Sequence, residues 1–301
     1  MCLYIGNKNG FVTKEEITVY KVLKKRYGVE GYCTPCQNFP VSLGEDLIPS
    51  NPEPSISSSG FKYALNGGAI HAFLDPVQAR KSYSSDEIFK ATIPAGTHIW
   101  IQDDLTQIAS RVLKISRDTI TNPTEELYHQ TLTQLADQIS LPVIRKDGEA
   151  IGIKVSKYVV STKWFKDVQF CDATPLKVPK KYSYETAGKD KNGEKNTKDL
   201  LTKNPGVKFS ALSLVEGGYL PSVGELKEVF MSMAELNLTR FGLGLDDIIP
   251  FAWFWTSTMK DEDKLWGLGS LGIWAIGPGS AVIDCTTGFY VLPFLSSCEG
   301  E

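Results

Sequence analysis

The stretch LPSVGEL at residues 220–226 decides the fold of the second half of the chain. Ser222 is followed three residues later by Glu225, which is the spacing of a capping box, where each side chain satisfies a backbone N–H group that the start of a helix leaves unpaired. Four apolar residues then follow at the helical spacing i, i+3, i+4 and i+7: Leu226, Val229, Phe230 and Met233. The pattern predicts that residues 222–236 form a helix lying on a hydrophobic core.

The segments on either side of this helix differ in composition. Beyond Gly242 the chain is aromatic and rich in glycine, which is typical of short strands joined by tight turns. The expected strands are residues 251–258, 265–268, 272–276, 281–285 and 289–294. Upstream, residues 151–160 carry valines that favour a strand. Residues 176–203 contain eight lysines and four acidic residues, and a charge run of this kind is expected to be a solvated loop.

Five segments of this half, in this order, resemble a bacterial and phage family of C-type-lectin-like domains: GEKNT at 193–197, LPSVGEL at 220–226, FWTST at 254–258, Trp266 and VLPF at 291–294. Such domains lie at the tips of adhesins, in collagen-like surface proteins and in the variable proteins of diversity-generating retroelements. The resemblance covers residues 141–301. It implies a compact, twisted antiparallel sheet with one or two flanking helices, and the fold class expected for the whole chain is α+β.

The resemblance also implies that a ligand binds on the late strands and their loops, here residues 259–264 and 274–287. The candidate ligand-binding residues are Lys260, Asp261, Asp263, Trp274, Asp284 and Thr286. The expected ligand is a protein or a glycan. Trp255 and Trp266 are expected in the core because tryptophan is highly buried on average, whereas for Trp274 a place in the core and a ligand contact both remain open.

Neither calcium nor another metal or cofactor is expected. Sugar-binding C-type lectins of animals hold calcium with Glu-Pro-Asn and Trp-Asn-Asp motifs, and here Glu53-Pro54 lies in the other half of the chain and is followed by Ser55. Calcium needs about six to eight oxygen ligands, and the late strands carry no dense cluster of carboxylates. Residues 259–290 contain no asparagine and one tyrosine, so the sequence bears no mark of retroelement diversification.

Residues 1–120 are expected to form a small α/β unit that attaches the protein to a larger assembly. Residues 34–59, rich in Pro, Ser and Gly, are expected to be a long surface loop. Asp75 and Pro76 are a suitable N-cap and first residue for a helix. The expected strands are residues 17–23, 67–73, 88–93, 97–101 and 108–115.

Residues 121–140 are expected to form a connector helix between this unit and a second domain at 141–301. Asn122 is a good N-cap and Pro123 suits the first helical position. Four residues form one apolar stripe along it: Tyr128, Leu132, Leu135 and Ile139.

No motif in the sequence points to catalysis. The chain lacks a Gly-x-Ser-x-Gly elbow, a Walker loop and a His-Glu-x-x-His motif. The lone pair Cys33-x-x-Cys36 falls short of the four ligands of a zinc site, so unlinked thiols in a surface loop are expected. His71 is expected to be a hydrogen-bonded core residue. The alternative is an enzyme in which His71 acts as a base with Asp75 or Asp103 near it.

The net charge and the lengths of the apolar runs also exclude several kinds of partner. The chain has 301 residues and a formal net charge of −3, which gives no electrostatic reason to expect nucleic acid or an anionic membrane as a partner. It has no apolar run of about 18 residues, so no membrane span is expected. It has no basic start followed by an apolar stretch, so no secretory signal is expected either. The expected location is a virion or the cytoplasm.

Together these patterns predict a non-enzymatic binding or adhesion protein of two domains, which presents a lectin-like unit as a structural component of a phage virion. A cytoplasmic interaction or scaffold protein is the first alternative. An enzyme housed in residues 1–120 around His71 is the second.

Overall fold

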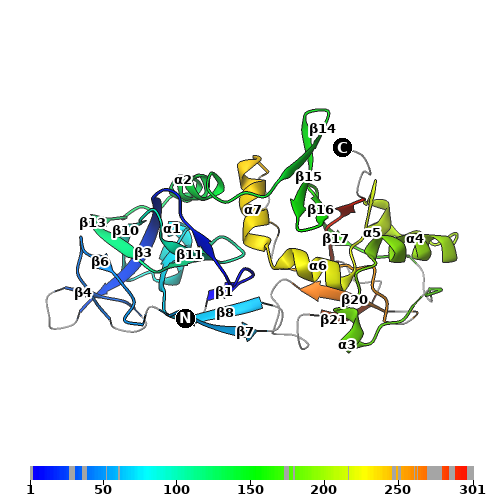
Figure 1. The fold of residues 1–301 in the computed structure, drawn as a ribbon, viewed down its shortest axis with the longest axis horizontal. Helices are drawn as coiled ribbons and strands as arrows, with labels where there is room; N and C mark the ends of the chain where they lie inside the picture. Colours follow the sequence, from blue (N-terminus) through cyan, green and yellow to red (C-terminus); the bar gives the residue numbers. More distant parts are fainter. Residues whose placement is uncertain are drawn as a thin grey trace. The chain divides into compact units, whose positions relative to one another are not determined.

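The computed structural model describes residues 3–26, 31–35, 39–51, 53–59, 62–172, 176–178, 180–215, 217–245, 249, 252–260, 262, 264–269, 280–284 and 289–296. The chain divides into two compact units. Unit 1 comprises Met1–Ser58, Lys62–Ser140 and Asn237–Ile248, and unit 2 comprises Ser59–Phe61, Leu141–Leu236 and Ile249–Glu301. Helices and sheets occur in both (Figure 1), so the chain has a mixed α+β fold.

Unit 1 is built on an antiparallel sheet with the order β2-β11-β12-β9-β3-β10-β13-β6 and with β4 and β5 attached beside β3. A second sheet has the order β1-β8-β7. The strands of the large sheet are β2 (Phe11–Val12), β3 (Ile17–Lys25), β4 (Tyr32–Cys33), β5 (Pro40–Val41), β6 (Asp46–Leu47), β9 (Ile70–Phe73), β10 (Glu87–Ile93), β11 (His98–Ile101), β12 (Gln107–Ser110) and β13 (Leu113–Thr119). Those of the small sheet are β1 (Leu3–Ile5), β7 (Ser55–Ser59) and β8 (Lys62–Gly67).

Two helices of unit 1 begin near the predicted places. Helix α1 (Pro76–Ser82) is capped by Asp75, whose Oδ1 accepts hydrogen bonds from the N–H groups of Val77 at 2.8 Å and Gln78 at 3.1 Å, as the sequence predicted. Helix α2 (Glu125–Ala136) begins after Thr124, so Asn122 does not cap it and Pro123 is not its first residue.

Helix α2 packs on β3 of unit 1. Gln134 Oε1 accepts a hydrogen bond from the N–H group of Thr18 at 2.9 Å, and Thr131 Oγ1 donates to the carbonyl oxygen of Thr18 at 3.0 Å. The apolar stripe therefore lies on the sheet, with Leu132 and Leu135 fully buried. By their contacts, residues 121–140 fall in unit 1.

The segment expected to be a long surface loop contains β5, β6 and β7. These strands are two to five residues long and lie at or near sheet edges, where backbone pairing tolerates Pro and Ser, so composition alone hides them. Cys33 lies on β4 and is buried, with its Sγ donating to the carbonyl oxygen of Lys24 at 3.8 Å. The expectation of a surface thiol was therefore wrong for Cys33, and Cys36 lies outside the described residues.

A buried ion pair ties the small sheet of unit 1 to the loop after β11. Lys62 Nζ lies 2.5 Å from Asp103 Oδ2, and the two side chains are 2% and 1% exposed. Asp103 Oδ1 also accepts a hydrogen bond from the N–H group of Gly6 at 3.2 Å. A buried charge of this kind is tolerated only when it is paired and hydrogen-bonded, so the carboxylate of Asp103 has a structural role.

The described residues of unit 2 form two five-stranded sheets, with the orders β14-β15-β16-β23-β18 and β17-β22-β19-β20-β21. The strand pairs are antiparallel, apart from β19 and β22, which run parallel. The expectation was one antiparallel sheet, so the structure differs in having two. Their strands are β14 (Val143–Lys146), β15 (Glu149–Val155), β16 (Tyr158–Ser161), β17 (Phe165–Val168), β18 (Gly218–Tyr219), β19 (Trp253–Phe254), β20 (Lys264–Gly269), β21 (Ser280–Asp284), β22 (Phe289–Val291) and β23 (Phe294–Leu295).

The lysine-rich residues 176–203 were expected to be a solvated loop, but they contain α3 (Tyr184–Ala187) and α4 (Gly193–Lys203). The buried residues of α4 stand at the helical spacing i, i+3, i+4 and i+7: Gly193, Asn196, Thr197 and Leu200. Three of these four are small or polar. Because a search for apolar periodicity gives such residues no weight, it does not detect this buried face.

The helix predicted over residues 222–236 is divided in two. Helix α6 (Val223–Phe230) begins at the predicted capping box, and α7 (Met233–Gly242) follows after a turn at Met231. Buried apolar residues continue from one helix to the other, including Phe230 and Met233 on either side of the turn, so the apolar spacing extends across the break and conceals it. Residues 151–160 likewise form parts of two strands, β15 and β16, joined by a turn in which Ser156 has a φ of +56°.

Among the described residues, no helix has both the length and the apolar character needed to cross a membrane.

Candidate functional site

The residues predicted to bind a ligand are only partly described by the structure. Lys260 is described and half-buried, and Asp284 is the last residue of β21. The other four lie outside the described residues: Asp261, Asp263, Trp274 and Thr286.

Strand pairing brings Lys260 and Asp284 to one end of unit 2's second sheet. Met259 forms an antiparallel bridge with Leu265, and Leu265 pairs with Ile283 on the neighbouring strand. Lys260 directly follows Met259, and Asp284 directly follows Ile283. Lys264 pairs with Asp284. We call this end of the sheet the β20–β21 edge, defined by Met259, Lys260, Glu262, Lys264 and Asp284.

The β20–β21 edge is fixed to the preceding segment 176–182. The N–H group of Tyr182 donates to the carbonyl oxygen of Met259 at 3.0 Å, and that of Leu176 donates to the carbonyl oxygen of Glu262 at 2.8 Å. Lys181 forms an exposed ion pair with Glu262 at 2.9 Å. The backbone of the edge at Met259 and Glu262 is therefore held in place, while the side chains of Lys181 and Glu262 are more than half exposed.

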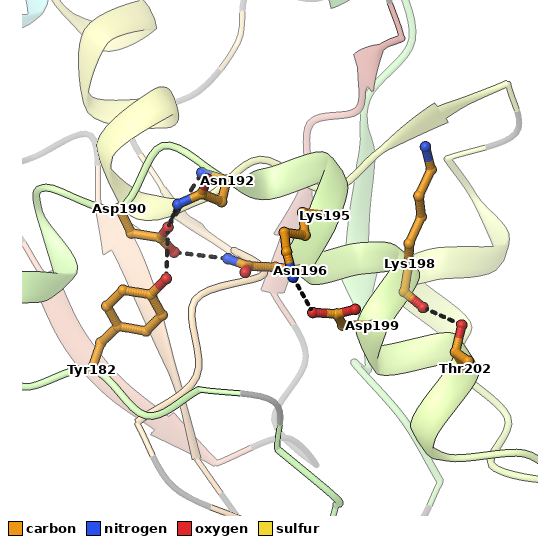
Figure 2. Close-up of polar contacts among 8 residues, drawn as sticks. All are labelled: Tyr182, Asp190, Asn192, Lys195, Asn196, Lys198, Asp199 and Thr202. Carbon is orange, nitrogen blue, oxygen red and sulfur yellow. Dashed lines mark hydrogen bonds and ion pairs between the residues drawn. The ribbon is translucent and has the colours of Figure 1, made fainter.

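A buried carboxylate, Asp190, accepts five hydrogen bonds, one of them from Thr258, the residue before Met259 of this edge. Figure 2 shows the bonds from Tyr182, Asn192 and Asn196. Asp190 is 3% exposed. Its Oδ1 accepts from the hydroxyl of Tyr182 at 3.0 Å and from the side-chain and backbone nitrogens of Asn192 at 3.1 and 3.2 Å. Its Oδ2 accepts from Asn196 Nδ2 at 2.8 Å and from Thr258 Oγ1 at 2.7 Å. Burial and the hydrogen bond to Asp190 raise the pKa of Tyr182 to about 12.

The backbone of Asp190 is joined to the start of α6. Its carbonyl oxygen accepts hydrogen bonds from Ser222 Oγ at 2.7 Å and from the N–H group of Gly224 at 3.0 Å. A side chain at position 224 would place its Cβ 2.3 Å from that oxygen, so only glycine fits. Glu225 Oε2 accepts from the N–H groups of Ser222 at 2.9 Å and Gly193 at 3.2 Å, and the capping box therefore also fastens the start of α4.

The FWTST segment at 254–258 completes this arrangement. The N–H group of Val223 donates to Thr258 Oγ1 at 3.0 Å, and that of Ser257 donates to the carbonyl oxygen of Pro221 at 2.8 Å. Trp255 is 0% and Trp266 4% exposed, which confirms both as core residues. The segments 193–197, 220–226 and 254–258, which suggested the family, thus meet around Asp190. We call this interlocked set of hydrogen bonds the Asp190 junction.

Sequence reasoning did not single out Asp190, which is one of the four acidic residues in the lysine-rich segment. Its partners lie at positions 182, 192, 196, 222, 224 and 258. The local pattern that could have identified Asp190 is Asp-x-Asn at 190–192. An Asp side chain often accepts a hydrogen bond from the backbone N–H group two residues further along the chain.

A second candidate site is a cavity of about 380 Å³ within unit 1. Its apolar lining includes Phe39, Leu47, Ile48, Phe73 and Tyr83. Its polar lining includes Lys21, Asn66, His71 and Gln107.

His71 lies on β9, is half-buried and lines this cavity, which differs from the expected core position. Burial and the nearby charge of Lys21 lower the pKa of His71 to about 4, so the imidazole is neutral at pH 7. The carboxylates of Asp75 and Asp103, proposed as its partners, accept their hydrogen bonds from other groups, namely from the start of α1 and from Lys62 with Gly6. Neither carboxylate therefore orients His71 as a base.

Within the described part of the chain, no group of three or more His, Cys, Asp or Glu side chains is arranged to hold a metal ion.

Comparisons with known proteins gave little. No protein-family model matches the sequence, and no curated protein matches it. Among solved structures, the chain is similar to a fimbrial protein from Bacteroides ovatus ATCC 8483, with a TM-score of 0.37, 10% sequence identity, and coverage of 97% of this chain and 70% of that chain. A similarity at that TM-score carries no argument about the fold or function of this chain.

The substitution Asp190→Asn is expected to destabilise unit 2 by about 2–4 kcal/mol, because the amide group cannot accept all five hydrogen bonds and leaves buried donors unsatisfied. Urea unfolding followed by near-UV circular dichroism measures this loss. Asp199→Asn is the matched control in the neighbouring helix α4, since Asp199 forms an i,i+4 pair with Lys195 at 3.1 Å, and the loss of such a pair costs about 0.5 kcal/mol or less. Equal stability of the two variants would contradict the role given to Asp190.

The stability of unit 1 is expected to fall as the pH decreases from 6.5 towards 4. The folded chain holds the pKa of His71 at about 4, below its ordinary value of 6.5, so between these values the unfolded chain binds a proton that the folded chain does not, and stability is lost as pH falls. Urea unfolding at several pH values measures this slope, and His71→Gln should reduce it. An unchanged slope in that variant would show that His71 is not the group responsible.

Proposed function

We propose that this chain is a non-catalytic binding protein of the adhesion type, in which unit 2 is a C-type-lectin-like domain that binds a protein or a glycan at its β20–β21 edge. The observation that carries the proposal is the Asp190 junction. Three of the segments that resemble the family converge there through hydrogen bonds, and Thr258 of the junction directly precedes Met259 of the edge to which the family resemblance assigns the ligand.

The physical character of the edge supports binding. Surfaces that recognise polar ligands must hold their groups in place before the ligand arrives, because ordering them on binding costs affinity. The backbone of Met259 and Glu262 is tied to segment 176–182, and Thr258 is tied to Asp190. The side chains of Lys181 and Glu262 are each more than half exposed, so charged groups of both signs are available to the hydroxyls of a glycan or to a polar protein surface.

The absence of catalysis is part of the same proposal. It is supported by the hydrogen bonds of the two carboxylates considered as partners of His71. Asp75 accepts from the start of α1, and Asp103 accepts from Lys62. A histidine with a pKa near 4 is also a weak general base at neutral pH, because such a base works best with a pKa near the operating pH.

Unit 1 is proposed to attach the chain to a larger assembly, and a phage particle is the assembly favoured by the family resemblance, which includes phage proteins. Sedimentation of the native source, with mass spectrometry to locate this chain, measures this. The chain is expected in the fraction of virus-sized particles. Recovery in the small soluble fraction alone would contradict the particle proposal and favour the cytoplasmic scaffold.

Substitution of the β20–β21 edge is expected to weaken binding without unfolding the chain. The probe is the fluorescently labelled full chain, applied to an array of immobilised glycans and to intact bacterial cells. The double variant Lys260→Ala with Asp284→Ala should bind about tenfold or more weakly, since loss of two polar contacts of about 1 kcal/mol each has this effect.

The matched control is the double variant Glu149→Ala with Lys154→Ala, which removes the same two charge types from exposed positions on β15, in the other sheet of unit 2. The control should bind like the unchanged chain. Equal loss in both double variants, or no loss in either, would contradict the assignment of the ligand to the β20–β21 edge.

A further inference from the structure

We infer that Lys62 and Asp103 of unit 1 condense in the folded chain and form an amide bond between their side chains. Lys62 Nζ replaces Oδ2 on the carboxyl carbon of Asp103, and one water molecule leaves. This inference goes beyond the proposed function of unit 2 and uses none of its residues. It rests on the distance between the two groups, on their burial, and on the backbone that holds them.

The two reacting groups are already in contact. Lys62 Nζ lies 2.5 Å from Asp103 Oδ2, and the carboxyl carbon lies one bond of about 1.2 Å beyond this oxygen. Reacting atoms about 3–3.5 Å apart are in a near-attack position, and holding them there gives effective concentrations of about 10⁵ M or more. The fold thereby supplies the concentration that an amine and a carboxyl group lack in dilute solution.

Burial removes the obstacle that blocks this reaction in water, where the amine and the acid exist as ammonium and carboxylate ions that do not condense. The side chains of Lys62 and Asp103 are 2% and 1% exposed, and ions are costly in such a place. Burial also raises the pKa of Asp103 above its ordinary value. Transfer of one proton from the ammonium group to the carboxylate gives a neutral amine beside a neutral acid, and this step needs no other reagent.

The atoms of the reaction balance within the pair. The lone pair of Nζ attacks the carboxyl carbon, and the π electrons of the C=O bond move onto Oδ1. When they return, the bond to Oδ2 breaks, and Oδ2 leaves as water with the acid proton and one proton from nitrogen. The N–H group of Gly6 donates to Oδ1 at 3.2 Å and stabilises the negative charge that collects there during attack. Oδ1 then remains as the carbonyl oxygen of the new amide.

The pairing of β1 with β8 places the amine beside the donor to Oδ1. Ile5 of β1 pairs with Tyr63 of β8, so Gly6 stands opposite Lys62 in the register of this antiparallel pair. One pair of strands therefore supplies both the attacking amine and the N–H group that polarises the carboxyl group of Asp103. The amide bond links β8 covalently to the loop after β11.

The loop that carries Asp103 is held firmly within unit 1. The carbonyl oxygen of Asp103 accepts a hydrogen bond from Asn237 Nδ2 at 3.0 Å, and the N–H group of Leu105 donates to the carbonyl oxygen of Gln102 at 2.9 Å. Leu105 is fully buried and has a φ of +57°, a strained conformation that persists only where the surrounding structure enforces it and that is common at functional sites. The carboxyl group is therefore held at a fixed place beside Lys62.

Peptide mapping of the full chain, kept folded at pH 7 and then denatured and digested with trypsin, tests the inference. Trypsin does not cleave after a lysine whose amine is acylated. Most molecules are expected to yield residues 27–80, uncut at Lys62, joined to residues 91–111, at a mass one water below the sum of the two peptides. Fragmentation should place the link at Lys62 and Asp103. Complete cleavage after Lys62, together with a free peptide of residues 91–111, would overturn the inference.

Two lysine variants provide the controls. Lys62→Arg keeps a positive charge but lacks the primary amine, so its denatured chain should have the full mass of its sequence. Lys25→Arg makes the same change in an exposed ion pair, where Lys25 lies 3.0 Å from Glu87 and the side chains are 74% and 32% exposed. The unchanged chain and Lys25→Arg should each weigh one water less than their sequences.

The masses are measured on denatured chains, so the results for the unchanged chain and for Lys25→Arg stand even if Lys62→Arg does not fold. A missing water in Lys62→Arg as well would place the dehydration elsewhere in the chain and overturn the inference. A full mass for the unchanged chain would overturn it too.

Discussion

The carboxylate of Asp190 is the constraint on which the arrangement of unit 2 depends. A buried carboxylate costs several kcal/mol to remove from water, and this cost is offset only when hydrogen bonds satisfy its lone pairs. Here the donors come from Tyr182, Asn192, Asn196 and Thr258, which lie on separate segments of the chain. The segments must take up these positions together, because the absence of any one would remove hydrogen bonds from the buried carboxylate of Asp190. The start of α4, the start of α6 and the segment 254–258 are therefore coupled to one another.

This coupling explains why the segments 220–226 and 254–258, which resemble a lectin-like family, are buried. Thr258 Oγ1 donates to Asp190 and accepts from Val223, so a single hydroxyl joins two of those segments. Their residues preserve a scaffold, and the recognition that we propose belongs to the adjoining β20–β21 edge, where the side chain of Glu262 is exposed. In unit 1, the cavity lined by Lys21 and His71 is also lined by residues of the β8–β9 turn.

Sequence patterns predicted the features whose cause is local. The capping box of Ser222 and Glu225, the cap at Asp75, the long strand β3 and the burial of Trp255 all follow from neighbouring residues or from side-chain type. Features that rest on distant partners were not predicted. Helix α4 buries Gly193, Asn196 and Thr197, which show no apolar period, and the hydrogen bonds of Asp190 reach as far as Thr258. The cavity could not be foreseen either, because its lining joins β3 to a segment that composition assigns to a loop.

Amide hydrogen exchange at the start of α6 tests the central claim most directly. The first N–H groups of a helix have no partner within the helix, so protection of Ser222, Val223 and Gly224 arises from Glu225, Thr258 and Asp190. These amides are expected to exchange only through the global unfolding of unit 2. The first amides of α2, where no side chain caps the helix, should exchange much faster. Exchange of Ser222, Val223 and Gly224 as fast as at the start of α2 would contradict the account of the Asp190 junction.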